Sequence, residues 1–176
     1  GKFSGGTFAS FMATVEQTKA DPSLRKVLGD PYGLNPKGVR GPDGSDQRSV
    51  RYDDDYESWT APFVMASVNT RVVRRSHALL EEPWGEDFSY SEFMITGRGS
   101  RGFLRASGIT AGLAGLLTAS VVPVTKPLVE RKLPSPGEGP SRAERQAGMF
   151  EHHLLAIGGD DEVRGKVVGP QDPGYG

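Results

Sequence analysis

Glycine and proline interrupt this chain so often that long, unbroken helices cannot make up most of its fold. The sequence contains 24 glycines and 13 prolines among 176 residues, about a fifth of the chain against roughly 12% in average proteins. Glycine weakens the interior of a helix and proline breaks it. A chain of this length can still bury a core as one domain. The sequence therefore predicts that residues 1–176 form a single loop-rich domain.

The charge balance and the absence of cysteine exclude several classes of protein. The chain has 21 basic and 22 acidic side chains and a net charge of −1, so no global field attracts nucleic acid. Without cysteine there is no disulfide, no thiolate metal site and no cysteine nucleophile. The acidic run 53–55 does not have the spacing of metal ligands. We expect a cytoplasmic protein without a metal, and no pattern identifies a catalytic residue.

Helical periodicity is found in three segments of the chain. Residues 7–20, 61–80 and 103–121 carry apolar side chains every three or four positions and are predicted to be helices. Glycine, proline, serine and charged residues dominate 29–58 instead. That stretch is predicted to be a long surface loop.

Alternating patterns predict strands in two other segments. Residues 86–96 alternate as a strand does, and residues 147–168 read as a hairpin with its turn at 158–160. The order of helices and strands lacks the regular alternation that a parallel sheet requires. The sequence therefore predicts an α+β fold, in which a mixed, partly antiparallel sheet holds the strand and the hairpin and the helices pack on it.

Arginines cluster on the predicted helix 61–80. Arg71, Arg74 and Arg75 are neighbours because positions i, i+3 and i+4 share one side of a helix. Such a cluster can clamp a phosphate or carboxylate, and Asn69 can add an amide hydrogen bond. The other interpretation is a solvated face that is paired with local acids. An apolar stripe lies on another side of the same helix and consists of Met65, Val68, Val72 and Leu79.

The start of the first predicted helix is a second candidate binding site. Gly5, Gly6 and Thr7 lie where free backbone N–H groups and the positive end of the helix favour an anion or a substrate carbonyl. Two glycines also let a ligand approach the backbone closely. An ordinary helix start, capped by Thr7, explains the same residues.

Residues 97–102 match the G-x-G-x-x-G pattern of dinucleotide-binding loops between a strand and a helix. The strand before them carries serine and glutamate, whereas a central parallel strand is nearly all apolar. No second strand ends in an acidic residue at the distance where a ribose ligand belongs. We expect these glycines to serve the local turn rather than a cofactor.

Residues 106–125 carry no charge over a length that can span a bilayer. Glycine, serine and threonine are frequent there, and Pro123 lies inside the segment. These features favour a helix buried in a core or an interface over contact with a membrane.

Four segments together resemble one enzyme family. They are SGGT at 4–7, WTAPFVMASVNTRVVRRSHALL at 59–80, LPSPGEGPS at 133–141 and GPQDPGYG at 169–176. The chain resembles the saccharopine-dehydrogenase-like oxidoreductases, including the trans-acting enoyl reductases. The resemblance covers most of the chain, and its most specific parts are the stretch at 61–76 and the loop at 136–141.

The resemblance implies which part of such an enzyme this chain is. In that family a Rossmann domain binds NAD(P), and a second α+β domain closes over the active site and mediates dimerisation. The chain matches the second domain alone, so both of its ends are expected to continue into a larger polypeptide. The resemblance carries no catalytic acid or base onto a residue of this chain.

Two functions follow as expectations. The first is the substrate-binding and dimerisation domain of an NAD(P)-dependent oxidoreductase that reduces an enoyl or imine-type double bond of a small-molecule or acyl substrate. Its partners are then the cofactor domain of the same polypeptide and a second copy, and the chain alone is inactive. The second is a non-catalytic interaction or lipid-associated module, which the uncharged segment 106–125 suggests.

Overall fold

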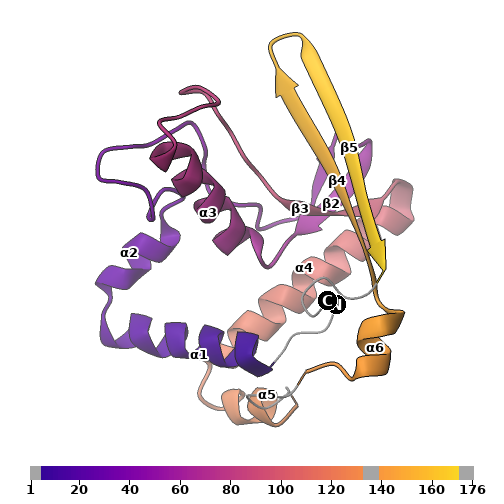
Figure 1. Ribbon diagram of the computed structural model, residues 1–176. Helices are drawn as coiled ribbons and strands as arrows, with labels where there is room; N and C mark the ends of the chain where they lie inside the picture. The colour runs from indigo at the N-terminus through magenta and orange to yellow at the C-terminus, as the bar shows by residue number, and fades with distance from the viewer. Residues whose placement is uncertain (1–4, 133–138, 171–176) are drawn as a thin grey trace. The chain divides into compact units, whose positions relative to one another are not determined.

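The computed structural model describes residues 5–132 and 139–170, in an order of helices and strands that Figure 1 shows. The motif at 133–141 therefore lies mostly outside the described residues, as do the last six residues of the chain. The elements are α1 (Gly5–Ala20), α2 (Ser23–Gly29), β1 (Arg51–Asp53), β2 (Ser58–Pro62), α3 (Ala66–Leu79), β3 (Phe93–Gly97), α4 (Gly99–Val121), α5 (Lys126–Lys132), α6 (Arg142–Ala147), β4 (Met149–Gly158) and β5 (Asp161–Pro170).

The chain divides into two compact units, each of which packs mainly within itself. One is Thr14–Val129, and the other combines residues 1–13 with residues 130–176. Helices and antiparallel sheets make up both units, so the predicted α+β class is confirmed. The assignment of the whole chain to one domain stays a prediction.

A three-stranded antiparallel sheet in the order β1-β2-β3 forms the core of the larger unit. Helix α4 runs against β2 and β3, as Figure 1 shows. Ala61 on β2 and Ala106 on α4 are completely buried. The ring of Trp59 meets that of Phe103 edge-on, with centroids 4.9 Å apart. This contact fixes the long helix on the sheet.

The central strand β2 occupies residues that the sequence predicts as the start of a helix. The helix predicted at 61–80 does not start at 61, because residues 58–62 pair with β1 on one side and β3 on the other. The Thr60 side chain is buried and its hydroxyl bonds to Gln47 and to the Arg51 carbonyl. Strand pairing on both sides thus outweighs the helix-start signals, and α3 begins at Ala66.

The predicted strand at 86–96 and the predicted single sheet also need correction. The strand β3 starts only at Phe93, because the stretch before it is held by side chains instead of a neighbouring strand. The Tyr90 N–H donates to Asp43, and the Tyr90 carbonyl accepts from Arg74. The hairpin is confirmed as β4 and β5, but in the described part of the chain it forms its own two-stranded sheet.

Helix α3 buries its polar side and exposes its apolar side. Thr70, Arg71, Arg74 and His77 are buried, with exposures between 0 and 8%. The predicted apolar stripe faces outward instead, with Val68, Val72 and Leu79 each at least half exposed. Helix α3 therefore rests on the preceding loop through polar contacts, and its apolar stripe is available to another surface.

The glycines at 97–102 have local structural reasons for their positions. Gly97 and Gly99 have φ angles of +106° and +62°, which favour glycine. Gly102 lies so close to the preceding turn that an added Cβ would be 1.9 Å from the Gly97 carbonyl oxygen. The Thr96 hydroxyl also donates to the Gly102 carbonyl over 3.0 Å. The pattern serves a tight connection from strand β3 to helix α4.

A pair of glycine substitutions tests this connection. Gly102→Ala should lower the free energy of unfolding by about 1–3 kcal/mol, because backbone must move to admit the methyl group. Gly108→Ala is the matched control in the same helix, since its Cβ would meet no atom within 4 Å. It should stabilise by about 0.5–1 kcal/mol through helix propensity. Urea denaturation measures both, and equal effects would contradict the close approach.

Candidate functional site

Arg71 lies buried at the centre of the contact between α3 and the loop at 30–46. Its Nη1 atom is 2.9 Å from Asp46 Oδ2 in an ion pair whose side chains are 9 and 14% exposed. The same guanidinium donates to the backbone carbonyls of Ser67, Leu28 and Asp30. A guanidinium fork suits several acceptors at once. Arg71 therefore holds helix α2, the loop and helix α3 together.

Arg74 makes a second buried ion pair one turn further along α3. Its Nε atom is 2.6 Å from Asp43 Oδ2, with side-chain exposures of 4 and 6%. It also donates to the carbonyls of Pro31 and Tyr90, and it lies over the ring of Tyr32. Buried charges are stable only when they are paired and hydrogen-bonded, and both arginines satisfy that condition.

The sequence analysis missed the acids of this network, although a signal for them was present. Three arginines within two turns repel one another, so partners of opposite charge were to be expected. Asp43 and Asp46 supply them from the segment that the sequence predicts as a plain surface loop. Thr70 joins the network by donating to Asp46 Oδ1 over 2.8 Å.

Asn69 and Arg75, two other predicted site residues on α3, are less buried than Arg71 and Arg74: Asn69 is half-buried and Arg75 is exposed. The Asn69 amide donates to Glu92 Oε2 over 2.9 Å, and Glu92 also accepts from the Tyr90 hydroxyl. Burial and this hydrogen bond raise the pKa of Tyr90 to about 12. The Arg75 side chain is exposed and donates to the Leu34 carbonyl. Of the three predicted residues on α3, Arg75 is the most accessible to a ligand.

Gly5, Gly6 and Thr7 form the first turn of helix α1, which begins at Gly5. The helix thus starts before Thr7, and Thr7 is not its cap. These residues belong to the smaller compact unit and α3 belongs to the larger one, so each group is described by itself. The roles of Gly5, Gly6, Thr7, Asn69, Arg71 and Arg75 in ligand binding stay predictions.

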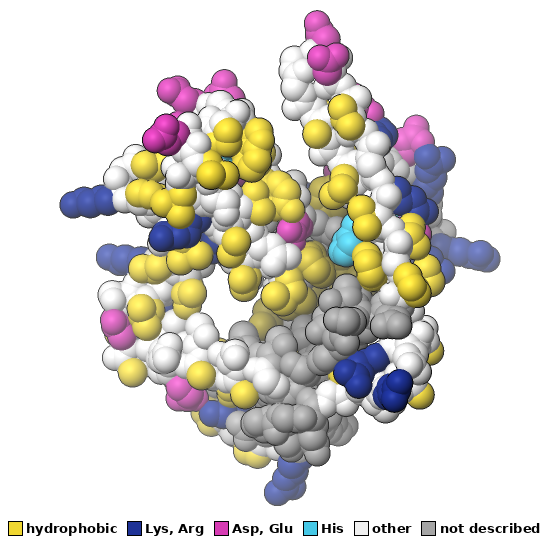
Figure 2. Space-filling model, viewed as in Figure 1, with side chains coloured by type: hydrophobic (Ala, Val, Ile, Leu, Met, Phe, Trp, Pro, Cys, Tyr) yellow, Lys and Arg dark blue, Asp and Glu magenta, His cyan; other side chains and the backbone are white. Residues whose placement is uncertain are grey.

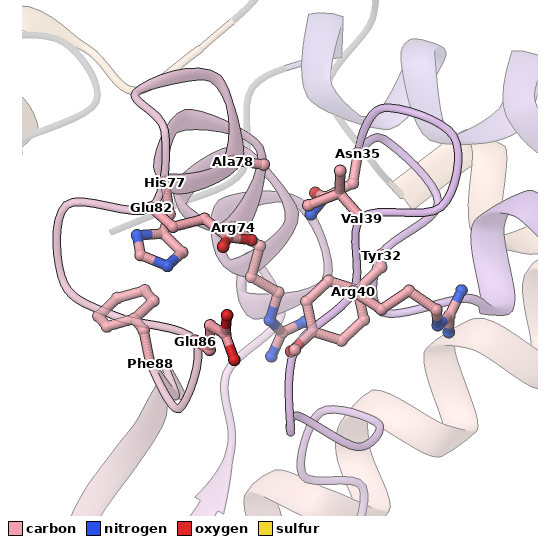
Figure 3. Close-up of a pocket in the computed structure, with 11 residues that line it drawn as sticks. Tyr32, Asn35, Val39, Arg40, Arg74, His77, Ala78, Glu82, Glu86 and Phe88 are labelled. Atoms are coloured by element: carbon pink, nitrogen blue, oxygen red, sulfur yellow. The ribbon is translucent and has the colours of Figure 1, made fainter.

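A small pocket lies between the loop and the end of α3, as Figure 3 shows. Its cavity volume is about 10 Å³, which is room for about one water molecule. The Arg74 side chain reaches from α3 toward the Tyr32 ring at its centre. His77 stacks on Trp84 with ring centroids 5.3 Å apart, and its Nε2 atom is 3.0 Å from the Gly85 carbonyl oxygen. This pocket is too small for an organic substrate.

Charge pairing also orders the rim of the loop. Arg40 forms two hydrogen bonds to the Asp30 carboxylate, and the Tyr32 backbone N–H donates a third. These bonds lower the pKa of Asp30 to about 2. In the described ranges, no three histidine or acidic side chains converge as metal ligands do. The described residues around α3 form an ordered polar network.

The comparisons with known proteins find relatives that carry the name of an enzyme. A protein of Mycobacterium tuberculosis that is provisionally named a trans-acting enoyl reductase is 38% identical over 99% of this chain. Trans-acting enoyl reductases of Mycobacterium bovis and Mycobacterium ulcerans are 34 and 32% identical over 84% of it. No family model matches the chain, and no solved structure matches it.

These relatives confirm the resemblance to the trans-acting enoyl reductases. The chain is a homologue of proteins with that name. It spans 44% of the length of the first relative and 38% of the others. The match therefore concerns one part of those proteins.

Alanine variants of two arginines on α3 test whether each side chain stabilises the fold. Arg71→Ala should lower the free energy of unfolding by about 3 kcal/mol or more, because it leaves Asp46 buried without its main partner. Sequence reasoning alone predicts little change in stability for this variant. Arg75→Ala is the control, because its exposed side chain should change stability by about 0.5 kcal/mol or less. Equal melting temperatures for both variants would contradict the buried ion pair.

Proposed function

We propose that the chain is the substrate-binding and dimer-forming part of an NAD(P)-dependent enoyl reductase of the saccharopine-dehydrogenase-like group. The observation that carries this proposal is the 38% identity over 99% of the chain to a longer protein with an enoyl-reductase name. In such a reaction the cofactor delivers a hydride to one carbon of the double bond, and a proton goes to the other. In an imine-type double bond the hydride goes to the carbon and the proton to the nitrogen.

In this proposal the described residues bind and orient rather than carry out the hydride chemistry, which belongs to the cofactor. Arg75 contacts an anionic group of the substrate or cofactor, since its guanidinium is exposed and bonds to the Leu34 carbonyl. The buried pairs of Arg71 and Arg74 hold the helix that presents it. Asn69 and the turn Gly5–Thr7 are the further contacts proposed from the sequence.

The apolar stripe of α3 supports the proposed partners. Val68, Val72 and Leu79 are exposed side by side on one helix, and monomeric proteins seldom leave large apolar surfaces uncovered. The cofactor domain of the same polypeptide and a second copy of the chain are the partners we propose. A cytoplasmic location is proposed with them.

Titration with NADPH tests whether the cofactor is bound outside this chain. The 176-residue chain should show no heat of binding to NADPH in a calorimetric titration, whereas the longer polypeptide that contains it should bind at micromolar concentration. Oxidation of NADPH with an enoyl thioester then tests the reaction itself. Micromolar binding of NADPH by the 176-residue chain would refute the proposal and make Gly97–Gly102 a candidate cofactor-binding loop.

A lipid-associated module is the second candidate, and helix α4 favours it. Within the described ranges it is the one helix that is long and apolar enough to cross a membrane, and only 11% of its most apolar window is buried. Leu104 and Leu117 are 67 and 46% exposed. Such side chains can enter the apolar layer of a membrane surface.

Flotation with phosphatidylcholine vesicles distinguishes the two candidates. If the lipid candidate is right, the chain should float with the vesicles, and Leu104→Asp should abolish flotation because a charge at that exposed position opposes insertion. Leu154→Asp, a change at a position outside α4 that is also more than half exposed, is the control and should still float. If the wild-type chain stays at the bottom of the gradient, the lipid candidate is refuted.

A further inference from the structure

An open pocket lies between the end of helix α2 and the loop that follows it, and neither proposed function uses it. Its cavity volume is about 290 Å³, and all its lining residues fall between positions 26 and 40 of the larger unit. Small-molecule sites have volumes of roughly 300–1,000 Å³. Unlike the pocket beside His77, this one therefore has room for a compact organic molecule.

Close backbone packing and a tight turn give this pocket its shape. Gly33 lies so near the end of α2 that an added Cβ would be 2.3 Å from the Val27 carbonyl oxygen. Further along the loop, the Val39 N–H donates to the Pro36 carbonyl over 3.1 Å. Gly38, inside that turn, has a φ of +89°, which favours glycine. The pocket is thus built into the backbone, as small-molecule sites usually are.

Positive charge is in excess among the side chains that line the pocket. They include Lys26, Lys37 and Arg40 but one acid, Asp30, and Figure 2 shows Lys and Arg side chains projecting on the side of the molecule where α2 lies. Arg40 already donates two hydrogen bonds to the Asp30 carboxylate. In the part of the chain that the structure describes, no acid pairs with Lys26 or Lys37. Two positive charges are therefore unbalanced and favour an anion.

The same pocket offers apolar contacts and lies beside a further cation. Val27, Pro36 and Val39 are among its lining residues, and the Val27 side chain is 44% exposed. The exposed Arg75 donates to the Leu34 carbonyl, and the residues on both sides of Leu34 line the pocket. An anion in this pocket can thus carry an apolar group and lies near the arginine that the proposed function uses.

We propose that this pocket binds the phosphate monoester of a small organic molecule, with Lys26 and Lys37 on the phosphate and Val27 and Val39 against the organic group. A phosphate monoester carries close to two negative charges at neutral pH, because its second pKa is about 6. Its charge therefore matches the two lysines, whereas a carboxylate or a sulfate monoester carries one charge. This inference rests on the proposed function and deepens it, since it assigns a class of anion and a place for it beside Arg75.

Titration with phenyl phosphate and phenyl sulfate tests the charge match, because the two esters have similar shapes and differ by one negative charge. Phenyl phosphate should bind the 176-residue chain in the millimolar range and shift the amide NMR signals of Gly33 and Gly38. Phenyl sulfate should bind at least about threefold more weakly, and so should inorganic phosphate, which has no ring to contact Val27 and Val39. Equal affinities for the two esters, or signal shifts confined to other residues, overturn the proposal.

Single substitutions test the two lysines. Lys26→Gln and Lys37→Gln should each weaken the binding of phenyl phosphate about threefold or more, as expected for the loss of one exposed ion pair. Both side chains are exposed, so the melting temperature should hardly change. Arg101→Gln on α4 is the matched control, because it removes an exposed positive charge that does not line the pocket. An equal loss of affinity in Arg101→Gln would mean general charge attraction and would overturn the proposal.

Competition with nucleotides identifies the source of the ester. NADP⁺ carries a phosphate monoester on its ribose and NAD⁺ does not. Displacement of phenyl phosphate by NADP⁺ alone supports the pocket and assigns the ester to the cofactor, whereas displacement by neither, with phenyl phosphate bound as expected, assigns it to the substrate. Equal displacement by both nucleotides overturns the proposal. Failure of phenyl phosphate to bind overturns the pocket alone, because micromolar NADPH binding and hydride transfer by the longer polypeptide are measured separately.

Discussion

The buried ion pairs of Arg71 with Asp46 and of Arg74 with Asp43 determine how the larger unit is organised. They attach a segment without helices or strands to a helix, and the carbonyls of Leu28, Asp30 and Pro31 complete their coordination. A loop rich in glycine and aspartate cannot bury enough apolar surface to hold a helix. Charged hydrogen bonds hold α3 to the loop instead. Because these bonds come from its polar side, α3 packs with that side inward.

That orientation leaves apolar side chains on the outside, and the relatives suggest why. The chain spans less than half the length of the relatives it matches, and we propose that other parts of such a polypeptide cover exposed apolar surfaces of this chain. The stripe on α3, the open sides of α4 and the apolar face of the hairpin are all surfaces of this kind. A partner that covers any of these surfaces has to present apolar side chains to it.

Long periodic segments could be predicted from the sequence, whereas short and tertiary-determined ones could not. The helices α1 and α4 have apolar residues at helical spacing, and the hairpin has alternating residues, so each could be predicted from its own segment. Strand β2 is five residues long, and only its pairing on both sides makes it a strand. The arginine cluster was visible on α3, but its acidic partners are 25 and 31 positions away in the sequence. Spacing within one helix cannot reveal such partners.

The polar contact between α3 and the loop also affects how this region opens. When apolar surface is exposed on unfolding, the heat capacity rises, and polar surface has the opposite effect. Separation of the loop from α3 exposes mainly guanidinium, carboxylate and peptide groups. Local opening here therefore has a small heat-capacity change, so its enthalpy is nearly the same at all temperatures. The open fraction of the segment beside the exposed Arg75 therefore follows a straight van't Hoff line from cold to warm conditions, whereas a lid that closes on an apolar core gives a curved one.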